Sequence, residues 1–289
     1  MSYVGRFAPS PSGPLHFGSL VAALGSYLRA RSLNGQWLVR IEDIDPPREM
    51  AGADTLILNA LEQYGLQWDG NVRYQSQQHE RYQATINQWL TDGSAYRCTC
   101  SRKMIKESGG FYRGHCRNQA VTNDEAHAIR IKVDAPIERF WDEKHGWMII
   151  PRELAEEDFI IRRRDGLIAY NLAVVLDDID QGITEVVRGA DLIEPTGRQI
   201  CLYQILNAQP ITYLHLPLAM DDSGYKLSKQ NRAPAIDDMP VTETLIKALK
   251  VLGLPVYPDL ALQSVDEIIK WGEKNWALDT LPNTLSVTV

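Results

Sequence analysis

Residues 6–19 read RFAPSPSGPLHFGS, a run in which three prolines and two glycines surround His16. The prolines fix φ and stiffen the turn, whereas Gly13 and Gly18 let a ligand approach the backbone closely. Apolar residues recur at helical spacing from Phe17 onward, so the turn leads into the start of a helix. Free N–H groups and the helix dipole at such an end favour phosphate. The stretch therefore predicts a phosphate-binding turn in which His16 can stabilise developing charge.

Strands and helices alternate on either side of this turn. The patterns predict a strand at 3–8, a helix from 17 that ends at Asn34-Gly35, a strand at 37–41, and helices at 54–64 and 78–90. Later they predict strands at 158–163 and 167–176 about an Asp165-Gly166 turn, a strand at 184–188, a helix at 196–207 and a strand at 211–216. This order indicates an α/β fold with a parallel sheet covered by helices.

The chain divides into four segments on these patterns. Residues 1–97 and 152–235 form the two halves of the sheet domain. Between them, 98–151 is a polar insertion with one clear strand at 128–133. Residues 236–289 form a helical C-terminal segment, with helices expected at 241–252 and 264–271.

Composition limits the classes of protein that the chain can belong to. Its 289 residues are 44% apolar and 23% charged, which is typical of a globular protein. It has no apolar run of about 18 residues and no secretory leader, so we expect a cytoplasmic protein without a membrane segment. The net charge of −7 disfavours binding of nucleic acid by bulk electrostatics but permits a local basic patch.

Three of the four cysteines are close together in the insertion, at positions 98, 100 and 116. In a cytoplasmic chain this clustering favours metal over disulfides, and three thiolates with one more ligand make a closed, structural zinc site. On residue type alone, His115 is the more usual fourth ligand. The alternative is three buried or free cysteines without a metal.

A second informative stretch is Lys226-Leu227-Ser228-Lys229-Gln230. Two ammonium groups on a loop can neutralise charge on a transferring phosphate. A Lys-x-x-Lys pattern alone is common on surfaces, but together with residues 6–19 it predicts a clamp for a nucleoside triphosphate.

Four stretches in this order resemble the class I glutamyl-tRNA synthetases. They are the Pro-x-Gly-x-Leu-His-x-Gly turn, RIEDIDPPR at 40–48, VRGADL at 187–192 and KLSK at 226–229. His16 to Ser19 stands at the HIGH signature and 226–230 at the KMSKS signature. The chain departs from these signatures at Ser19, Leu227 and Gln230. The resemblance implies a Rossmann-like class I catalytic domain interrupted by a zinc-bearing, acceptor-binding-like insertion.

The resemblance also implies roles for individual residues. The expected glutamate site consists of Arg6, Phe7, Ala8, Pro9, Ser10, Glu42, Tyr170 and Arg188. The expected ATP site consists of His16, Gly18, Ser19 and Lys229, and the expected catalytic residues are His16, Lys226 and Lys229. The expected zinc ligands are Cys98, Cys100, Tyr112 and Cys116. The chemistry agrees, because arginines suit the two carboxylates of glutamate and an acid suits its ammonium group.

Only residues 236–289 follow the lysine loop, so we expect no anticodon-binding domain. The chain therefore looks like the shortened paralogue family, the glutamyl-Q tRNA(Asp) synthetases. That family is a type of ligase that activates L-glutamate with ATP and Mg²⁺ without tRNA, and then transfers it to queuosine in tRNA(Asp). We expect a monomer. Two alternatives stay open: a glutamyl-tRNA synthetase that charges the tRNA 3′ end, and a non-catalytic RNA-binding module with a synthetase fold.

Overall fold

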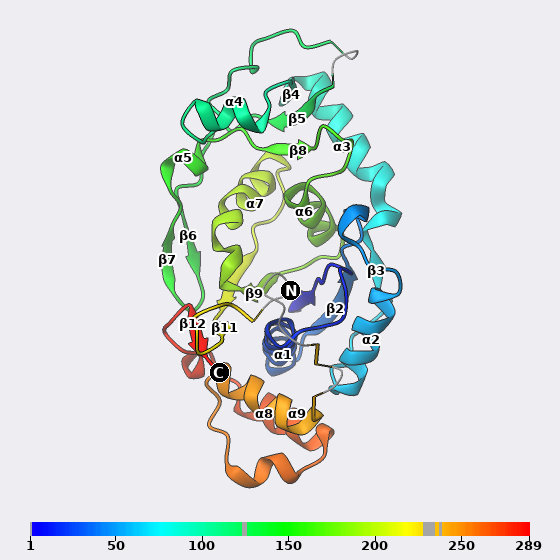
Figure 1. Cartoon of the computed structure of the whole chain (residues 1–289), viewed down its shortest axis with the longest axis vertical. Coiled ribbons are helices and arrows are strands. Elements are labelled where there is room, and N and C mark those ends of the chain that lie inside the picture. The colour runs from blue at the N-terminus through cyan, green and yellow to red at the C-terminus, as the bar shows by residue number, and fades with distance from the viewer. Residues whose placement is uncertain (1, 123–125, 228–234, 237–238) are drawn as a thin grey trace.

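The computed structural model describes residues 2–122, 126–227, 235–236 and 239–289. Figure 1 shows the elements along the chain. The first part contains β1 (Val4–Phe7), α1 (Phe17–Ser32), β2 (Gln36–Ile41), α2 (Ala53–Gln63), β3 (Arg73–Tyr74), α3 (His79–Asp92), β4 (Ala95–Cys98), α4 (Arg102–Glu107), β5 (Ala128–Ile131), β6 (Arg139–Asp142) and β7 (Gly146–Ile149). The second part contains α5 (Arg152–Ala155), β8 (Ile160–Arg162), α6 (Tyr170–Asp180), β9 (Glu185–Gly189), α7 (Ile193–Ile205), β10 (Thr212–Leu216), β11 (Leu218–Met220), α8 (Val241–Val251), α9 (Val265–Asn275) and β12 (Ser286–Thr288).

Two groups of strands meet in the middle of the molecule. One has the order β1-β2-β3 and the other β7-β6-β10-β9. β1 and β9 lie side by side, and the backbone N–H of Thr184 donates to the carbonyl of Val4 at 2.9 Å. Apart from the β6–β7 hairpin, the pairs within these groups are parallel. The strand order therefore reverses between β1 and β9, which is where α/β folds bind ligands.

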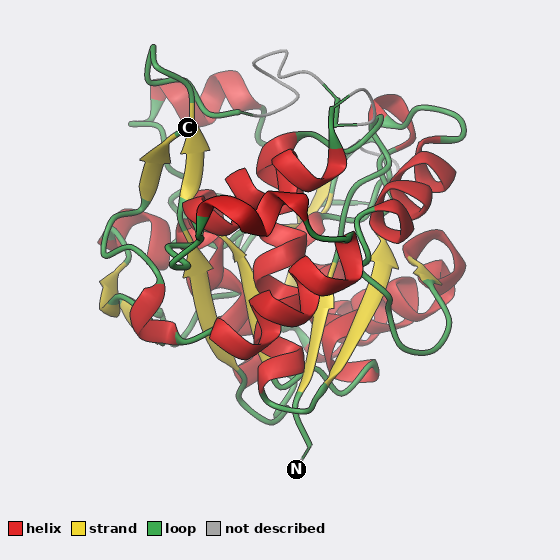
Figure 2. Ribbon diagram, turned by 90° about the horizontal axis from the view of Figure 1, so that it is seen from below, coloured by secondary structure: helices red, strands yellow, loops and turns green. Residues whose placement is uncertain are grey.

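Helices cover both faces of these strands, as Figure 2 shows. Phe7, Trp37 and Val39 point toward α1, α8 and α9 and share one buried core with them. The neighbouring residues Arg6 and Arg40 point the other way, toward α6. This alternation follows from the period of two in a strand. Within the described residues, no helix is both long and apolar enough to cross a membrane.

In the insertion predicted at 98–151, α4 and β5 lie at the opposite end of the long axis from α8 and α9, whereas β6 and β7 run along one side toward β11 and β12 (Figure 1). The described residues of the insertion contain three strands, β5, β6 and β7, so the single strand expected there was too few. β5 pairs with β4 and β8 in an antiparallel sheet, whereas β6 and β7 form a hairpin whose first strand joins β10. The four segment boundaries themselves stay a prediction.

Two further expectations about elements were wrong. The segment expected as a strand at 167–176 makes one bridge, between Ile168 and Arg162, and then forms α6. Its apolar side chains are buried on all sides of a helix, so a continuous apolar run gives no period to distinguish helix from strand. The C-terminal segment is not wholly helical, because β12 pairs with β11.

Candidate active site

A cavity of about 780 Å³ opens at the reversal between β1 and β9. It brings together the predicted residues Arg6, Phe7, Ala8, Pro9, Ser10, His16, Gly18, Ser19, Glu42, Tyr170, Arg188 and Lys226. Most come from the carboxyl ends of β1, β2 and β9, and the others from the starts of α1 and α6 and from the segment after β11. Lys229, expected in the ATP site, lies outside the described residues.

A buried group of charges lies next to this cavity, and one of its members, Arg6, lines it. Asp178 of α6 receives Arg6 Nε at 3.1 Å and Arg40 Nη2 at 2.8 Å. Burial alone would raise the pKa of Asp178, but the two guanidinium groups hold it below its ordinary value. Arg6 and Arg40 therefore have an ionised carboxylate as partner before any ligand binds.

Glu42 faces the same cavity, but within the described part of the chain its carboxylate is not held by hydrogen bonds as that of Asp178 is. It follows β2, and its backbone N–H donates to the carbonyl of Pro9 at 2.9 Å, which fixes it beside the turn. Its side chain is buried, and Oε1 has no hydrogen-bond partner among the described residues. Burial raises the pKa of Glu42 to about 7, although Arg40 acts in the opposite direction. A cationic ligand such as an ammonium group would stabilise the ionised form of this carboxylate.

Arg188 of β9 is held by neutral acceptors. Its donors reach His215 Nε2 at 3.3 Å, Gln199 Oε1 at 2.8 Å, the Tyr170 hydroxyl at 3.5 Å, Thr196 Oγ1 at 2.7 Å and the carbonyl of Leu192 at 3.2 Å. No carboxylate of the described residues forms an ion pair with it within 4.0 Å. The fixed and uncompensated charge of Arg188 suits a substrate carboxylate.

The start of α1 forms another wall. His16 is its N-cap: Nδ1 accepts from the backbone N–H of Ser19 at 3.2 Å, and Nε2 lies 2.9 Å from Ser19 Oγ. The first turn carries no acidic residue. The backbone N–H groups and the imidazole are therefore placed where an anion such as phosphate would be stabilised.

The segment after β11 packs directly on this helix start. A Cβ on Gly18 would meet the carbonyl oxygen of Leu227 at 2.6 Å, so only glycine allows the two backbones to approach so closely. The ammonium of Lys226 contacts Asp191 Oδ2 at 2.5 Å. The beginning of the predicted lysine loop thus lies beside the helix terminus that would bind phosphate.

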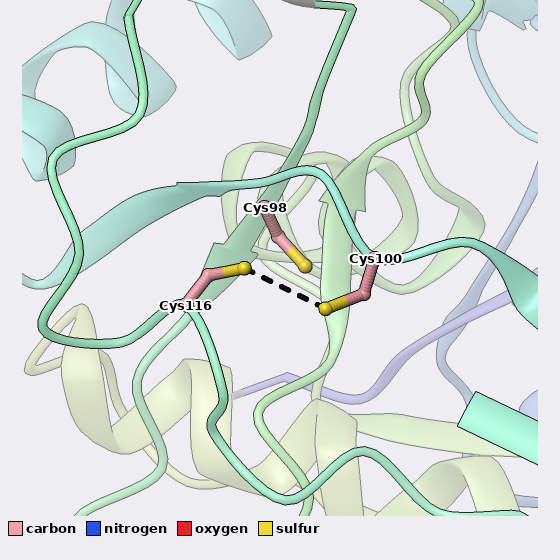
Figure 3. Close-up of side chains that lie close together, drawn as sticks. All are labelled: Cys98, Cys100 and Cys116. Carbon is pink, nitrogen blue, oxygen red and sulfur yellow. Dashed lines mark hydrogen bonds between the residues drawn. The ribbon is translucent and has the colours of Figure 1, made fainter. Parts of the chain in front are cut away.

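The cysteine cluster lies in the insertion, away from the cavity. The sulfur atoms of Cys98, Cys100 and Cys116 lie within 4.8 Å of one another, and Figure 3 shows all three converging. The sulfurs of Cys100 and Cys116 are 3.6 Å apart. Tetrahedral Zn–S bonds of about 2.3 Å would place two sulfurs about 3.8 Å apart, so the cluster fits zinc.

Tyr112 is better placed than His115 to be the fourth ligand of a metal held by the three cysteines. Tyr112 is buried against the cysteines, and its hydroxyl accepts the backbone N–H of Cys116 at 2.8 Å. His115 is exposed, and its Nε2 lies 3.4 Å from Gln119. These positions favour the ligand set that the resemblance implies.

Several residues that hold the arginines of the cavity were not predicted from the sequence as site residues. Asp178 lies just beyond the segment expected to be a strand at 167–176, and its contact with Arg6 depends on α6 being a helix there. Thr196 and Gln199 lie on α7, and they contact Arg188 only because α7 packs beside β9. Adjacent aspartates at the end of an apolar run were the one signal available for Asp178.

Comparison with known proteins gives consistent results. Residues 3–276 match the family model described as tRNA synthetases class I (E and Q), catalytic domain. The chain is 62% identical to the glutamyl-Q tRNA(Asp) synthetase of Vibrio vulnificus over 288 residues, covering 100% of this chain and 94% of that protein. It is 55% identical to the protein of the same name from Serratia proteamaculans over 287 residues, covering 99% and 94%.

A solved structure resembles the fold. The glutamate tRNA ligase from Elizabethkingia meningosepticum, crystallised in complex with its amino acid, superposes with a TM-score of 0.80 at 24% identity. The match covers 100% of this chain and 67% of that one. At this identity the likeness shows the fold alone.

Proposed function

The chain belongs to the class I tRNA synthetases of the glutamate and glutamine type, and we propose that it activates L-glutamate with ATP and transfers it to the queuosine base of tRNA(Asp). One observation carries the first half of this proposal. Among the described residues, Glu42 Oε1 has no hydrogen-bond partner and lies 3.7 Å from Arg40 Nη2, while Arg188 has no carboxylate partner. Both residues face one cavity beside the start of α1. A cavity with an acid, an arginine and a helix N-terminus suits an amino acid next to a phosphate.

In the proposed activation step, the α-carboxylate of glutamate attacks the α-phosphorus of ATP. A carboxylate O–P bond forms, the bond to the bridging oxygen breaks, and pyrophosphate leaves with the electron pair. Glu42 would hold the ammonium group, and Arg6, Tyr170 and Arg188 would orient the carboxylates. His16 and the N–H groups of α1 would stabilise charge on the phosphate, with Mg²⁺ accompanying ATP as substrate.

The lysine loop would complete the clamp. Lys226 already lies beside Asp191 at the cavity wall, and we propose that it and Lys229 neutralise the leaving pyrophosphate. This position supports the assignment of Lys226, whereas that of Lys229 rests on the resemblance alone.

The acceptor is inferred from the relatives. Proteins 62% identical to this chain are named glutamyl-Q tRNA(Asp) synthetases, and the chain spans 94% of their length. We propose the same acceptor here, because the match extends over the whole of this chain. Charging of the tRNA 3′ end and a non-catalytic role have no observation that favours them.

The cysteine cluster would hold a structural zinc ion with Cys98, Cys100, Tyr112 and Cys116 as ligands. The ion would fix the loop that carries Tyr112 and Cys116 onto β4. We also propose that the chain works as a monomer in the cytoplasm.

The activation step is tested by glutamate-dependent exchange of pyrophosphate into ATP in the absence of tRNA. We expect exchange with glutamate and none with glutamine. Glu42→Gln should abolish most of it, whereas Glu49→Gln, outside the cavity lining, should keep it. Absence of exchange in the native protein would revive the non-catalytic alternative.

The acceptor is tested with radiolabelled glutamate and two preparations of tRNA(Asp), with and without queuosine. We expect label only on the queuosine-containing tRNA. Removal of the 3′-terminal adenosine should leave that labelling intact. Loss of label on the trimmed tRNA would instead identify a synthetase that charges the 3′ end.

A further inference from the structure

Behind the cavity, three neighbouring strands place an acid, a histidine and an arginine in one row. In the parallel register, His215 of β10 lies opposite Arg188 of β9, and Tyr213 of β10 lies opposite Asp142 of β6. His215 Nδ1 is 2.7 Å from Asp142 Oδ2, and Arg188 Nε is 3.3 Å from His215 Nε2. Asp142 and His215 are completely buried. The row thus runs from inside the sheet to the cavity wall.

The contacts determine where the imidazole carries its proton. Both oxygens of Asp142 are acceptors, since Oδ1 receives the backbone N–H groups of Lys144 and His145 and Oδ2 receives that of His215. Nδ1 must therefore be the donor to Asp142. Nε2 then presents a lone pair, as the guanidinium N–H of Arg188 requires.

The charged groups around His215 keep it neutral. Burial holds the pKa of His215 below its ordinary value, Arg188 and the nearby His145 act in the same direction, and Asp142 opposes them. The remaining titratable neighbour is Tyr213, whose ring stacks 6.4 Å away. The neutral His215 therefore places no second positive charge beside Arg188.

The neutral imidazole leaves the positive charge of Arg188 without direct contact to any carboxylate that the structure describes. Arg6 donates directly to the carboxylate of Asp178, so its charge is balanced within the protein. Arg188 meets an imidazole instead, and the carboxylate of Asp142 stands one ring farther away. The guanidinium is fixed in position while its charge is left for a ligand.

We propose that His215, oriented by Asp142, is a positioning residue that holds Arg188 through a neutral acceptor and so reserves its charge for a substrate carboxylate. This inference rests on the proposed function for the identity of that substrate. It assigns no contact with substrate to His215 or Asp142.

Two substitutions distinguish the roles of the two ring nitrogens of His215. His215→Asn keeps an amide donor near the place of Nδ1, toward Asp142, but is too short to reach Arg188. His215→Gln places an amide oxygen near the place of Nε2 and keeps an acceptor for Arg188. The readouts are the KM values for glutamate and for ATP in pyrophosphate exchange, together with the thermal unfolding midpoint.

We expect His215→Asn to raise the KM for glutamate about tenfold, since a hydrogen bond to a charged donor is lost. Its KM for ATP should stay within about twofold, because the start of α1 is not touched. His215→Gln should lie much closer to the native protein. An unchanged KM for glutamate in His215→Asn, a parallel rise for ATP, or equal losses in both variants would overturn the proposal.

A second measurement uses the native protein, in case neither variant folds. Nitrogen-15 NMR of the histidine side chains should show His215 as the neutral tautomer protonated at Nδ1. Protonation at Nε2, or a charged ring at neutral pH, would refute the inference. If the native protein shows no glutamate-dependent exchange, the proposed function fails, and the NMR result still decides the tautomer.

Discussion

At the scale of single residues, some charged side chains at the cavity are balanced by ion pairs within the protein and others are not. Asp178 pairs with Arg6 and Arg40, so the charges of these two arginines are balanced within the protein, although Arg6 also lines the cavity. Glu42 and Arg188 have no such partner of opposite charge within hydrogen-bond distance among the described residues. An amphoteric ligand supplies both missing partners at once, which is why we place the amino acid between them.

We expect Glu42 to make the binding of glutamate depend on pH. Its pKa of about 7 means that the free protein carries it partly protonated at neutral pH, and only the ionised form can accept an ammonium group. We therefore expect kcat/KM for glutamate to rise with pH and to level off above about 7. Pyrophosphate exchange between about pH 5.5 and 8.5, about 1.5 units on either side of this value, measures it. A profile that is flat across this range would show that Glu42 does not hold the ammonium group.

Asp178 should be a determinant of stability. Asp178→Ala leaves two buried guanidinium groups without their carboxylate, a change that costs about 3–5 kcal/mol in comparable buried pairs. Denaturant unfolding measures the loss. As a control, Asp165→Asn removes an exposed partner of Arg163 and should change the free energy of unfolding far less. Equal effects of the two substitutions would mean that the buried group of charges contributes little.

At the scale of elements, local signals determined what the sequence could predict. The prolines and glycines of residues 6–19, the helix from Phe17 and the strand that ends before Glu42 have short-range patterns, and the structure has these elements where they were expected. The run at 167–176 is apolar on every side, so its helix was misread as a strand. The row from Asp142 to Arg188 depends on pairing between distant strands, which no local pattern reports.

The loop that carries Tyr112 and Cys116 has little regular structure, so a metal would be its main support. We expect the purified protein to contain about one zinc ion per chain, and Cys116→Ser to lose it and to lower the unfolding temperature by several degrees. Tyr112→Phe should weaken zinc retention against a chelator, whereas His115→Ala should not. Metal analysis of the three variants tests this. Zinc loss in His115→Ala alone would reverse the choice of the fourth ligand.

At the scale of the whole molecule, the C-terminal strand is connected to the cavity. β12 pairs in parallel with β11, and Leu218 and Ala219 of β11 line the cavity. The carbonyl of Ala219 also accepts the backbone N–H of Leu227 at 2.8 Å. The last strand therefore lies on one edge of β11, and the start of the lysine loop lies on the other.

This arrangement predicts that the C-terminal strand affects the use of ATP. Deletion of residues 284–289 removes the bond from the N–H of Leu218 to the carbonyl of Leu285 and that from the N–H of Val289 to the carbonyl of Met220, at 2.9 and 3.0 Å. β11 would then lose one of its two neighbours, and the backbone at Leu227 would no longer be held close to Gly18. We expect the KM for ATP to rise several-fold, while the KM for glutamate, bound at the ends of β1, β2 and β9, changes less.

A milder variant keeps this test valid if the deletion destabilises the whole chain. Val289→Pro removes only the donor to Met220 and should shift the KM for ATP in the same direction by a smaller amount. Both variants are compared at equal folded fraction, checked by the unfolding midpoint. Unchanged ATP kinetics in a folded deletion variant would show that β11 keeps the lysine loop in place without β12. A rise for glutamate as large as that for ATP would instead indicate a general loosening of the cavity.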